Sequence, residues 1–419
     1  MNASKLWNVA RWTCDRIWSE TGEIPEDDVL KAYLKSHERY GDLHSQSSQR
    51  VIEELAEAFD GWYAKRRNGD DRANPPGYRK RGDDHPRSTV TWKQNGFKLD
   101  TKNDRVRLSK GQNHKQYLTE PDYILCEYDL PPEISLSPDT LQQVRAVYTH
   151  REWRLQFVCK YDLGAVDSPG SETAGVDLGI CNFAAVSYSR GDTELYPGHA
   201  LKEDEYYFLK EIAKCTDSDS NRARRLHEKR TERRAHYIHV VTSAIIETCL
   251  NNGVGELFVG DIRGIRDDED EEGNKIARDW GTHGNLDLHS WPFDLVITAL
   301  KYKGALKGIR VTEVDERNTS RTCCWCGTRD NSQRVERGLY VCECSTVANS
   351  DIGGAENIRL KGIGAFKTRS TSESVSASAE KDRSTGCLAQ PVVNLFRRGR
   401  DVPSSEQGRL VDQTSIGKP

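Results

Sequence analysis

Three carboxylates in this sequence stand where they could together hold divalent cations. Asp177 interrupts the apolar run 174–179, where an unpaired carboxylate would cost several kcal/mol to bury. Glu316 ends the strand-like run 309–316, and Asp351 opens a helix-like segment. Ligand sets made only of oxygen favour Mg²⁺ or Mn²⁺, and two such ions about 4 Å apart activate a water and stabilise the leaving oxygen of a phosphodiester. For any single Asp, a structural salt bridge is the commoner alternative.

These carboxylates meet only if the fold brings their elements together. Three strand signals follow one another within residues 173–198, and a long helix comes next. A strand at 255–262, a helix at 291–306 and a strand at 308–316 complete the series. This order is typical of the ribonuclease-H-like α/β fold. In that fold the first, fourth and fifth strands are adjacent and parallel, so we expect their carboxyl ends to converge.

The segments before this fold have a different character. Apolar residues step by three and four over residues 45–67, which predicts an amphipathic helix. Short alternating segments run from residue 88 to 162 and predict a small β-barrel or sandwich with helices on its N-terminal side. The polar C-terminal residues predict a disordered tail. We expect N-terminal helices and a barrel at 1–170, and the first part of the ribonuclease-H-like domain at 171–317. A zinc ribbon at 318–348, the last part of that domain at 349–365 and a tail at 366–419 would follow.

Five of the 12 cysteines fall between residues 323 and 344. Cys323 and Cys326 form a C-x-x-C pair, and Cys342 and Cys344 form a C-x-C pair. Four thiolates from two tight turns suit tetrahedral zinc, so we predict a structural zinc ribbon. The second pair is one residue shorter than the usual C-x-x-C spacing. Two alternatives therefore stay open: Cys324 replaces a ligand of the first pair, or the ribbon has lost or weakened its zinc.

The net charge of −4 gives no sign of nucleic-acid binding, so any such surface must be local. Residues 221–234 carry seven basic side chains against two Glu and lead without Gly or Pro into an apolar-periodic run, which predicts one long helix, basic at its start. We expect these basic residues to contact phosphates, the alternative being a solvated charged face. A second basic segment covers 77–87, and the acidic run 266–272 is interpreted as a solvated loop. The seven basic residues are Arg222, Arg224, Arg225, Lys229, Arg230, Arg233 and Arg234.

Composition excludes other classes of protein. The hydrophobic residues make up 36% of the chain, the mean hydropathy is −0.76, and no apolar run approaches the roughly 20 residues that cross a bilayer. We therefore expect no membrane association. The first 30 residues carry charge throughout and lack a continuous apolar core, so we expect no secretory signal and a cytoplasmic location.

Several motifs between residues 40 and 362 resemble, in the same order, those of the TnpB (OrfB-type) proteins of insertion sequences. These proteins are RNA-guided nucleases related to the type V CRISPR effectors and to the eukaryotic Fanzor proteins. The acidic loop and the run 387–391 look most like haloarchaeal members. The matching motifs are Asp42–Gln46, Pro75-Pro76, Gly175–Gly179, Tyr302-Lys303, Asn318–Gly327, Tyr340–Cys342 and Asn349–Ile358.

The resemblance implies a RuvC-like nuclease domain with an Asp, Glu, Asp triad, in which Asp177 and Asp351 match the two aspartates. Relatives commonly carry the Glu on the fourth strand, but this chain has Gly260-Asp261 there. Some relatives carry it on the fifth strand, at the place of Glu316. We expect Glu316 to complete the triad, with Asp261 as the alternative, because strand alternation turns Asp261 to the face opposite Gly260.

The function that the resemblance implies is a transposon-encoded, RNA-guided DNA endonuclease. Its partners would be guide RNA and target DNA, with base pairing supplying sequence specificity. Its metals would be structural Zn²⁺ and catalytic Mg²⁺ or Mn²⁺. The alternative is a nuclease-dead, RNA-guided DNA-binding regulator or a decayed relic. Gly353, which replaces an Asn usual in the last motif, is a second departure from the family pattern.

Overall fold

The structure is a computed structural model of the chain. It contains no helix, among the residues it describes, that is long and apolar enough to span a membrane. The predicted basic segment 77–87 is described only to residue 79, and the run 387–391 only from residue 390. The described residues are 2–79, 89–117, 121–130, 136–149, 152–160, 164, 166–217, 220–261, 267–269, 275–277, 291–329, 334–336, 338–367, 390–396 and 410–411.

The chain divides into two compact units, Met1–Asp162 and Leu163–Pro419. Helices of the first unit pack around a core that includes Leu6, Ile52 and Leu55, all of them fully buried. The amphipathic helix predicted at 45–67 is confirmed as α3. The helical elements of this unit are α1 (Asn2–Thr21), α2 (Asp27–Leu34), η1 (Glu38–Asp42), α3 (Ser45–Arg67), η2 (Gln94–Gly96) and α4 (Gln112–Tyr117).

The strands of the first unit form two antiparallel sheets, ordered β1-β5-β6 and β2-β3-β4. Side chains from both sheets, Trp92 and Val144 from one and Val106 from the other, share one apolar cluster. The strands therefore form a sandwich-like pair, and the pairings of the described strands do not close the predicted barrel. The strands are β1 (Val90–Lys93), β2 (Phe97–Asp100), β3 (Arg105–Ser109), β4 (Tyr123–Glu127), β5 (Leu141–Thr149) and β6 (Glu152–Cys159).

The second unit is built on a six-stranded sheet of order β13-β10-β7-β8-β9-β17. The β7, β8 and β9 strands are antiparallel neighbours, whereas β10 is parallel to both β7 and β13. The first, fourth and fifth strands of the expected series are thus adjacent and parallel. The strands are β7 (Glu172–Leu178), β8 (Asn182–Tyr188), β9 (Thr193–Pro197), β10 (Val254–Asp261), β13 (Arg310–Asp315) and β17 (Val392–Val393).

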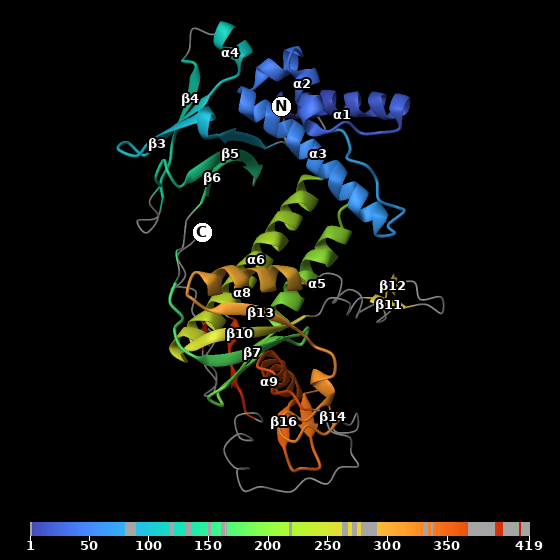
Figure 1. Cartoon of the computed structure of the whole chain (residues 1–419), viewed down its shortest axis with the longest axis vertical. Helices are drawn as coiled ribbons and strands as arrows, with labels where there is room; N and C mark the ends of the chain where they lie inside the picture. The colour runs from blue at the N-terminus through green and yellow to red at the C-terminus, as the bar shows by residue number, and fades with distance from the viewer. Residues whose placement is uncertain are drawn as a thin grey trace. The chain divides into compact units, whose positions relative to one another are not determined.

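Helices cover both faces of this sheet (Figure 1). The α6 (Asn221–Asn251) and α8 (Phe293–Ala305) helices pack on one face against a core that includes Val176, Leu257 and Val259. The α9 helix (Ser350–Gly362) packs on the other face. Its approach needs Gly175, because a Cβ added there would lie 2.1 Å from the carbonyl oxygen of Ala355.

Two features of the second unit differ from the sequence interpretation. The expected series contained no helix between β9 and α6, but α5 (His199–Ala213) lies there and packs against α6. Residues Asp267–Glu269 of the acidic run, expected as loop, pair as β11 with β12 (Lys275–Ala277).

The expectation of a disordered C-terminal tail is wrong for the segment 390–396. The β17 strand pairs in parallel with β9, and the backbone N–H of Asn394 donates to the carbonyl of Leu195 at 2.8 Å. The Phe396 ring, in β18 (Leu395–Phe396), lies 4.9 Å from the ring of Tyr237 on α6. The β18 strand also pairs with β19 (Leu410–Val411). Residues Val392–Val393 of the apolar run VVNLF thus extend the sheet, and Phe396 packs against α6.

Candidate metal sites and nucleic-acid surface

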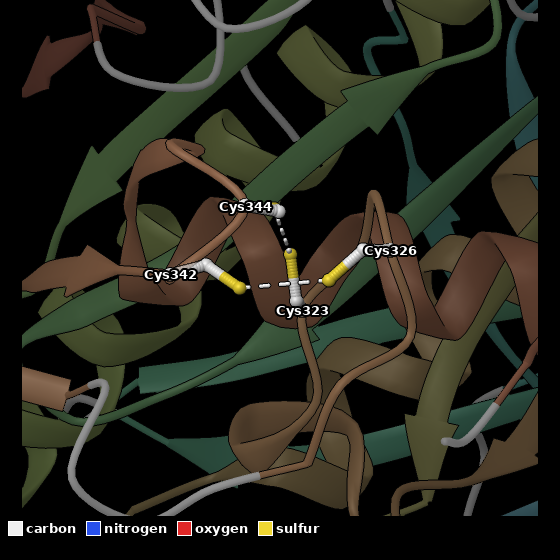
Figure 2. Close-up of side chains that lie close together, drawn as sticks. All are labelled: Cys323, Cys326, Cys342 and Cys344. Carbon is white, nitrogen blue, oxygen red and sulfur yellow. Dashed lines mark hydrogen bonds between the residues drawn. The ribbon is translucent and has the colours of Figure 1, made fainter. Parts of the chain in front are cut away.

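The four predicted zinc ligands form one compact group. The Sγ atoms of Cys323, Cys326, Cys342 and Cys344 all lie within 4.8 Å of one another (Figure 2). Cys323 Sγ is 3.8 Å from Cys344 Sγ, and Cys326 Sγ is 3.5 Å from Cys342 Sγ. Sulfurs bound at about 2.3 Å to one tetrahedral zinc lie about 3.8 Å apart. The group could therefore hold a metal ion.

The short C-x-C spacing is compatible with this group. Tight turns follow the ligand pairs: Gly327 donates to the carbonyl of Cys323, and Ser345, with a left-handed φ of 70°, donates to that of Cys342, each at 2.9 Å. These turns lead into the small sheet β14-β15-β16, which packs against α9. Its strands are β14 (Arg334–Glu336), β15 (Leu339–Val341) and β16 (Val347–Asn349).

Cys324 lies outside the ligand group. Its side chain packs against the apolar cluster that contains Ile352 and Ala355 of α9, and burial raises the pKa of its thiol. The alternative in which Cys324 replaces a ligand is therefore not what the geometry shows.

Strand register places two of the predicted carboxylates on the α9 face of the sheet. Val259 of β10 is opposite Val176 of β7, so Gly260 is next to Asp177. Gly260 is in turn opposite Val314 of β13, and Glu316 follows two residues later on the same face. Asp261 pairs with Asp315 and belongs to the opposite face. The register thus favours Glu316 over Asp261 as the companion of Asp177.

The Glu316 side chain occupies the space above Gly260. A Cβ added at Gly260 would lie only 1.8 Å from Glu316 Oε1. A larger residue at position 260 and the present Glu316 conformation are therefore mutually exclusive. The absence of a side chain at Gly260 thus leaves the space that the Glu316 carboxylate occupies.

Asp177 and Asp351 both adjoin α9. A Cβ added at Gly354 would lie 2.4 Å from Asp177 Oδ2, so this glycine lets the helix approach the carboxylate. Asp351 is in the first turn of α9, and Asn182 Nδ2 donates to its Oδ2 at 2.7 Å. The Asn349 side chain caps the helix by accepting from the N–H of Asp351 at 3.0 Å. Sequence reasoning missed Asn182, because nothing in its local pattern indicates a partner 169 residues away.

The three carboxylates do not converge on a single point. Among the residues that the structure describes, the cysteine group alone brings three or more candidate ligand atoms within 4.8 Å of one another. Asp177, Glu316 and Asp351 instead line the contact between the sheet and α9, each from a different element.

The carboxyl group of Glu316 is strongly perturbed. Its Oε1 is buried and has no hydrogen-bond partner among the described residues. Burial is the main cause that raises its pKa to about 7, and the nearby charges of Asp261 and Asp315 contribute to this rise against the opposing effect of Lys361. A cation beside Glu316 would favour the ionised form and lower this pKa.

This shift predicts a pH-dependent stability. The neutral carboxyl stabilises the metal-free fold below its ordinary pKa of 4.5, and that contribution is lost as pH rises through about 7. A shift of this size corresponds to roughly 3 kcal/mol at 1.36 kcal/mol per unit. Urea unfolding of the protein with zinc supplied and Mg²⁺ withheld should show a larger decline in stability between pH 5 and pH 8 than the Glu316→Gln variant shows. An equal decline in the free energy of unfolding of the two proteins would show that Glu316 does not have the raised pKa.

Ion pairs with α5 occupy most of the predicted basic surface on α6. Arg230 and Arg234 both donate to Glu205, a side chain only 6% exposed, at 2.6 and 2.9 Å. Arg233 donates to Asp204 at 2.6 Å and Arg222 to Glu211 at 2.9 Å. These four arginines fasten α6 to α5, a role that the sequence interpretation did not foresee because it missed α5.

Two basic residues of α6 lie free of such pairs. Arg225 and Lys229 are exposed, one helical turn apart, and neither has an ion-pair partner within the described part of the chain. Arg224 differs, since its Nε is buried without a hydrogen-bond partner there. Of the seven predicted basic residues, Arg225 and Lys229 are therefore the exposed ones without an ion pair in the described part of the chain.

Two family models match this chain. OrfB_IS605, described as "Probable transposase", matches residues 156–266, and "Cas12f1-like, TNB domain" matches residues 293–358. The first range contains Asp177 and the basic part of α6. The second contains Glu316, the cysteine group and Asp351.

Similar proteins extend the match over most of the chain. "TnpB-like protein ORF457" of Acidianus two-tailed virus is 24% identical over 401 residues, covering 86% of this chain and 82% of that protein. A Streptomyces pristinaespiralis protein named "Putative RNA-guided DNA endonuclease" is 22% identical over 340 residues, covering 77% and 73%. The solved structure "Cryo-EM structure of the Cas12f1-sgRNA-target DNA complex" matches 85% of this chain and 91% of its own chain at 14% identity, with a TM-score of 0.36. The matching models and relatives show that the chain is similar to TnpB-type proteins over most of its length.

Proposed function

We propose that this protein is a transposon-encoded, RNA-guided DNA endonuclease whose second unit is a RuvC-like nuclease of the ribonuclease-H-like fold. The observation that carries the proposal is the contact between the sheet and α9. Asp177 and Glu316 face this contact from β7 and from the end of β13, and Asp351 enters it from the first turn of α9. The parallel order of β7, β10 and β13 supports the fold.

The three carboxylates would hold Mg²⁺ or Mn²⁺. Carboxylate oxygens are the ligands that these ions prefer. The buried Glu316 Oε1, which has no hydrogen-bond partner among the described residues, fits a cation neighbour. When bound, such ions supply an activated water and stabilise the leaving oxygen of a phosphodiester. Carboxylates that serve two ions about 4 Å apart need not meet at one point. Asn182 would orient Asp351 through its hydrogen bond to Oδ2.

The four cysteines would hold a structural Zn²⁺. A site with four thiolates leaves no open position for substrate, so its role is to stabilise the fold. The β16 strand of the ribbon leads directly into α9, so the zinc would fix the start of the helix that carries Asp351.

Guide RNA and target DNA are the proposed partners, by analogy with the relative named as an RNA-guided DNA endonuclease. Base pairing with the guide would supply sequence specificity. The first unit would hold the guide RNA and read a short DNA motif, and Arg225 and Lys229 would contact phosphates.

The direct test is cleavage of a plasmid by the full chain with the RNA that copurifies from its native locus. A guide-matched plasmid should be cut in Mg²⁺, whereas an unmatched plasmid, or the matched one in excess EDTA, should stay intact. Guide-dependent binding without cutting in any divalent ion would instead favour the nuclease-dead regulator.

The free and paired basic residues of α6 should behave differently when changed. Replacing Arg225 and Lys229 with Gln should weaken nucleic-acid binding and reduce the slope of log K against log salt by about 1 for each lost phosphate contact. The matched control replaces Arg230 and Arg234 with Gln. This control should lower the thermal midpoint, because it leaves the buried Glu205 carboxylate unpaired. If the slope of log K against log salt falls more in the control than in the first variant, the paired arginines bind phosphates and the distinction between free and paired residues is wrong.

A further inference from the structure

The segment that joins Glu316 to the first zinc ligand is held by its own turns. The carbonyl of Glu316 accepts hydrogen bonds from the N–H and the Oγ1 of Thr319, at 3.0 and 2.8 Å. Asn318 adopts a left-handed φ of 70°, and its carbonyl accepts from Thr322 Oγ1 at 2.8 Å. Cys323 follows immediately, and its N–H donates to the carbonyl of Thr328 at 2.9 Å. Glu316 and the cysteine group are thus the two ends of one ordered segment, 316–323.

Two side chains of α9 hold the outward carbonyls of this segment. Asn357, only 1% exposed, donates from Nδ2 to the carbonyls of Thr319 and Thr322, each at 2.7 Å. Lys361 donates from Nζ to the carbonyls of Asp315 and Arg317, at 2.8 and 2.6 Å. Residues 357 and 361 are one helical turn apart and face the same side of α9. Four carbonyls between residues 315 and 322, including those on both sides of Glu316, therefore bind to one helix.

The same helix contacts the other two carboxylates. Asp351 belongs to its first turn, and Gly354 lies against the Asp177 carboxylate. The rigid body of α9 therefore fixes where the Glu316 backbone stands relative to Asp351 and Asp177. We infer that Asn357 and Lys361 are positioning residues that hold Glu316 in register with the other two carboxylates, and that they tie this register to the cysteine group. This inference rests on the proposed role of Glu316.

Neither residue is one of the three proposed ligands, so the expected effect is indirect. Residues that orient a metal ligand typically contribute about 10–100-fold to metal affinity. The Asn357→Ala variant removes both amide donors, and Lys361→Met removes the ammonium while keeping the length of the side chain. Lys361→Arg keeps donors at the same place and should rescue. Lys307→Met is the matched control, since this exposed lysine follows α8, on the other side of the sheet.

The experiment measures Mn²⁺ affinity of the full chain by electron paramagnetic resonance, and zinc content by elemental analysis. Lys361→Met and Asn357→Ala should bind Mn²⁺ about 10–100-fold more weakly. Lys361→Arg and Lys307→Met should bind it as the wild type does. All four should retain zinc at the wild-type level, which separates misplacement of Glu316 from loss of the ribbon.

The outcomes distinguish the inference from the proposed function. If Glu316→Gln loses Mn²⁺ affinity but Lys361→Met does not, the positioning role is wrong and the proposed site stands. If Glu316→Gln also binds Mn²⁺ normally, the proposed site itself fails. Should Asn357→Ala fail to fold because its side chain is buried, Lys361→Met decides, since its side chain is partly exposed and its rescue by Lys361→Arg is specific to the hydrogen bonds.

Discussion

Changing Glu316 to Gln should reduce guided DNA cleavage on the order of 1,000-fold, that is, three factors of ten at about 1.36 kcal/mol each. Gln keeps the shape that fills the space above Gly260 but removes the negative charge of a proposed metal ligand. Stabilisation of transition-state charge by bound ions is worth several kcal/mol, so the loss of one ligand accounts for an effect of this size. Rates of plasmid cleavage under single-turnover conditions measure it.

Asp261→Asn is the matched control for this change. Asp261 is a neighbouring carboxylate at the end of β10, and strand alternation turns it to the face opposite Gly260. It should cleave at nearly the wild-type rate. Binding of guide RNA and target DNA should be unchanged in both variants. If Asp261→Asn loses cleavage while Glu316→Gln keeps it, the third carboxylate is Asp261 and the register argument fails.

Periodicity in the sequence was sufficient to predict the elements that carry these carboxylates. The apolar run around Asp177 predicts β7, and the strand-like run 308–316 predicts β13, which Glu316 follows. Alternation along β10 also predicts that Asp261 and Gly260 face opposite sides. These features follow from local pattern, because the side-chain periods of helices and strands are fixed by backbone geometry.

Contacts between distant segments could not be predicted in this way. The sequence shows a run of arginines, but not that Arg230 and Arg234 share Glu205 of α5. It shows Asn357 as part of a motif, but not that its amide reaches two carbonyls more than 30 residues earlier. A hydrogen bond of this kind depends on which elements the fold brings together, and local sequence patterns do not determine which distant elements become neighbours.

Loss of zinc should have the second large effect, and Cys342→Ser is the change that tests it. The apparent binding free energy of a structural zinc is about 10–16 kcal/mol in small zinc-binding peptides, as large as the whole stability of many domains. The small sheet β14-β15-β16 has its buried side chains mainly around the cysteine group, so it has little other core to replace that contribution. We therefore expect Cys342→Ser to lose zinc, to unfold the ribbon and to lower the thermal midpoint of the second unit.

The neighbouring cysteine supplies the control for this experiment. Cys324→Ala removes a thiol that packs against α9 but lies outside the ligand group, so it should keep the wild-type zinc content and lose only packing energy, about 1 kcal/mol. Elemental analysis and thermal unfolding of both variants measure the difference. Zinc loss from Cys324→Ala but not from Cys342→Ser would show that Cys324 is the ligand, and a wild-type chain without zinc would show that the ribbon no longer binds it. Because β16 leads into α9, the zinc-free ribbon should also release Asp351 from its place beside Asn182, and cleavage should fall together with zinc content.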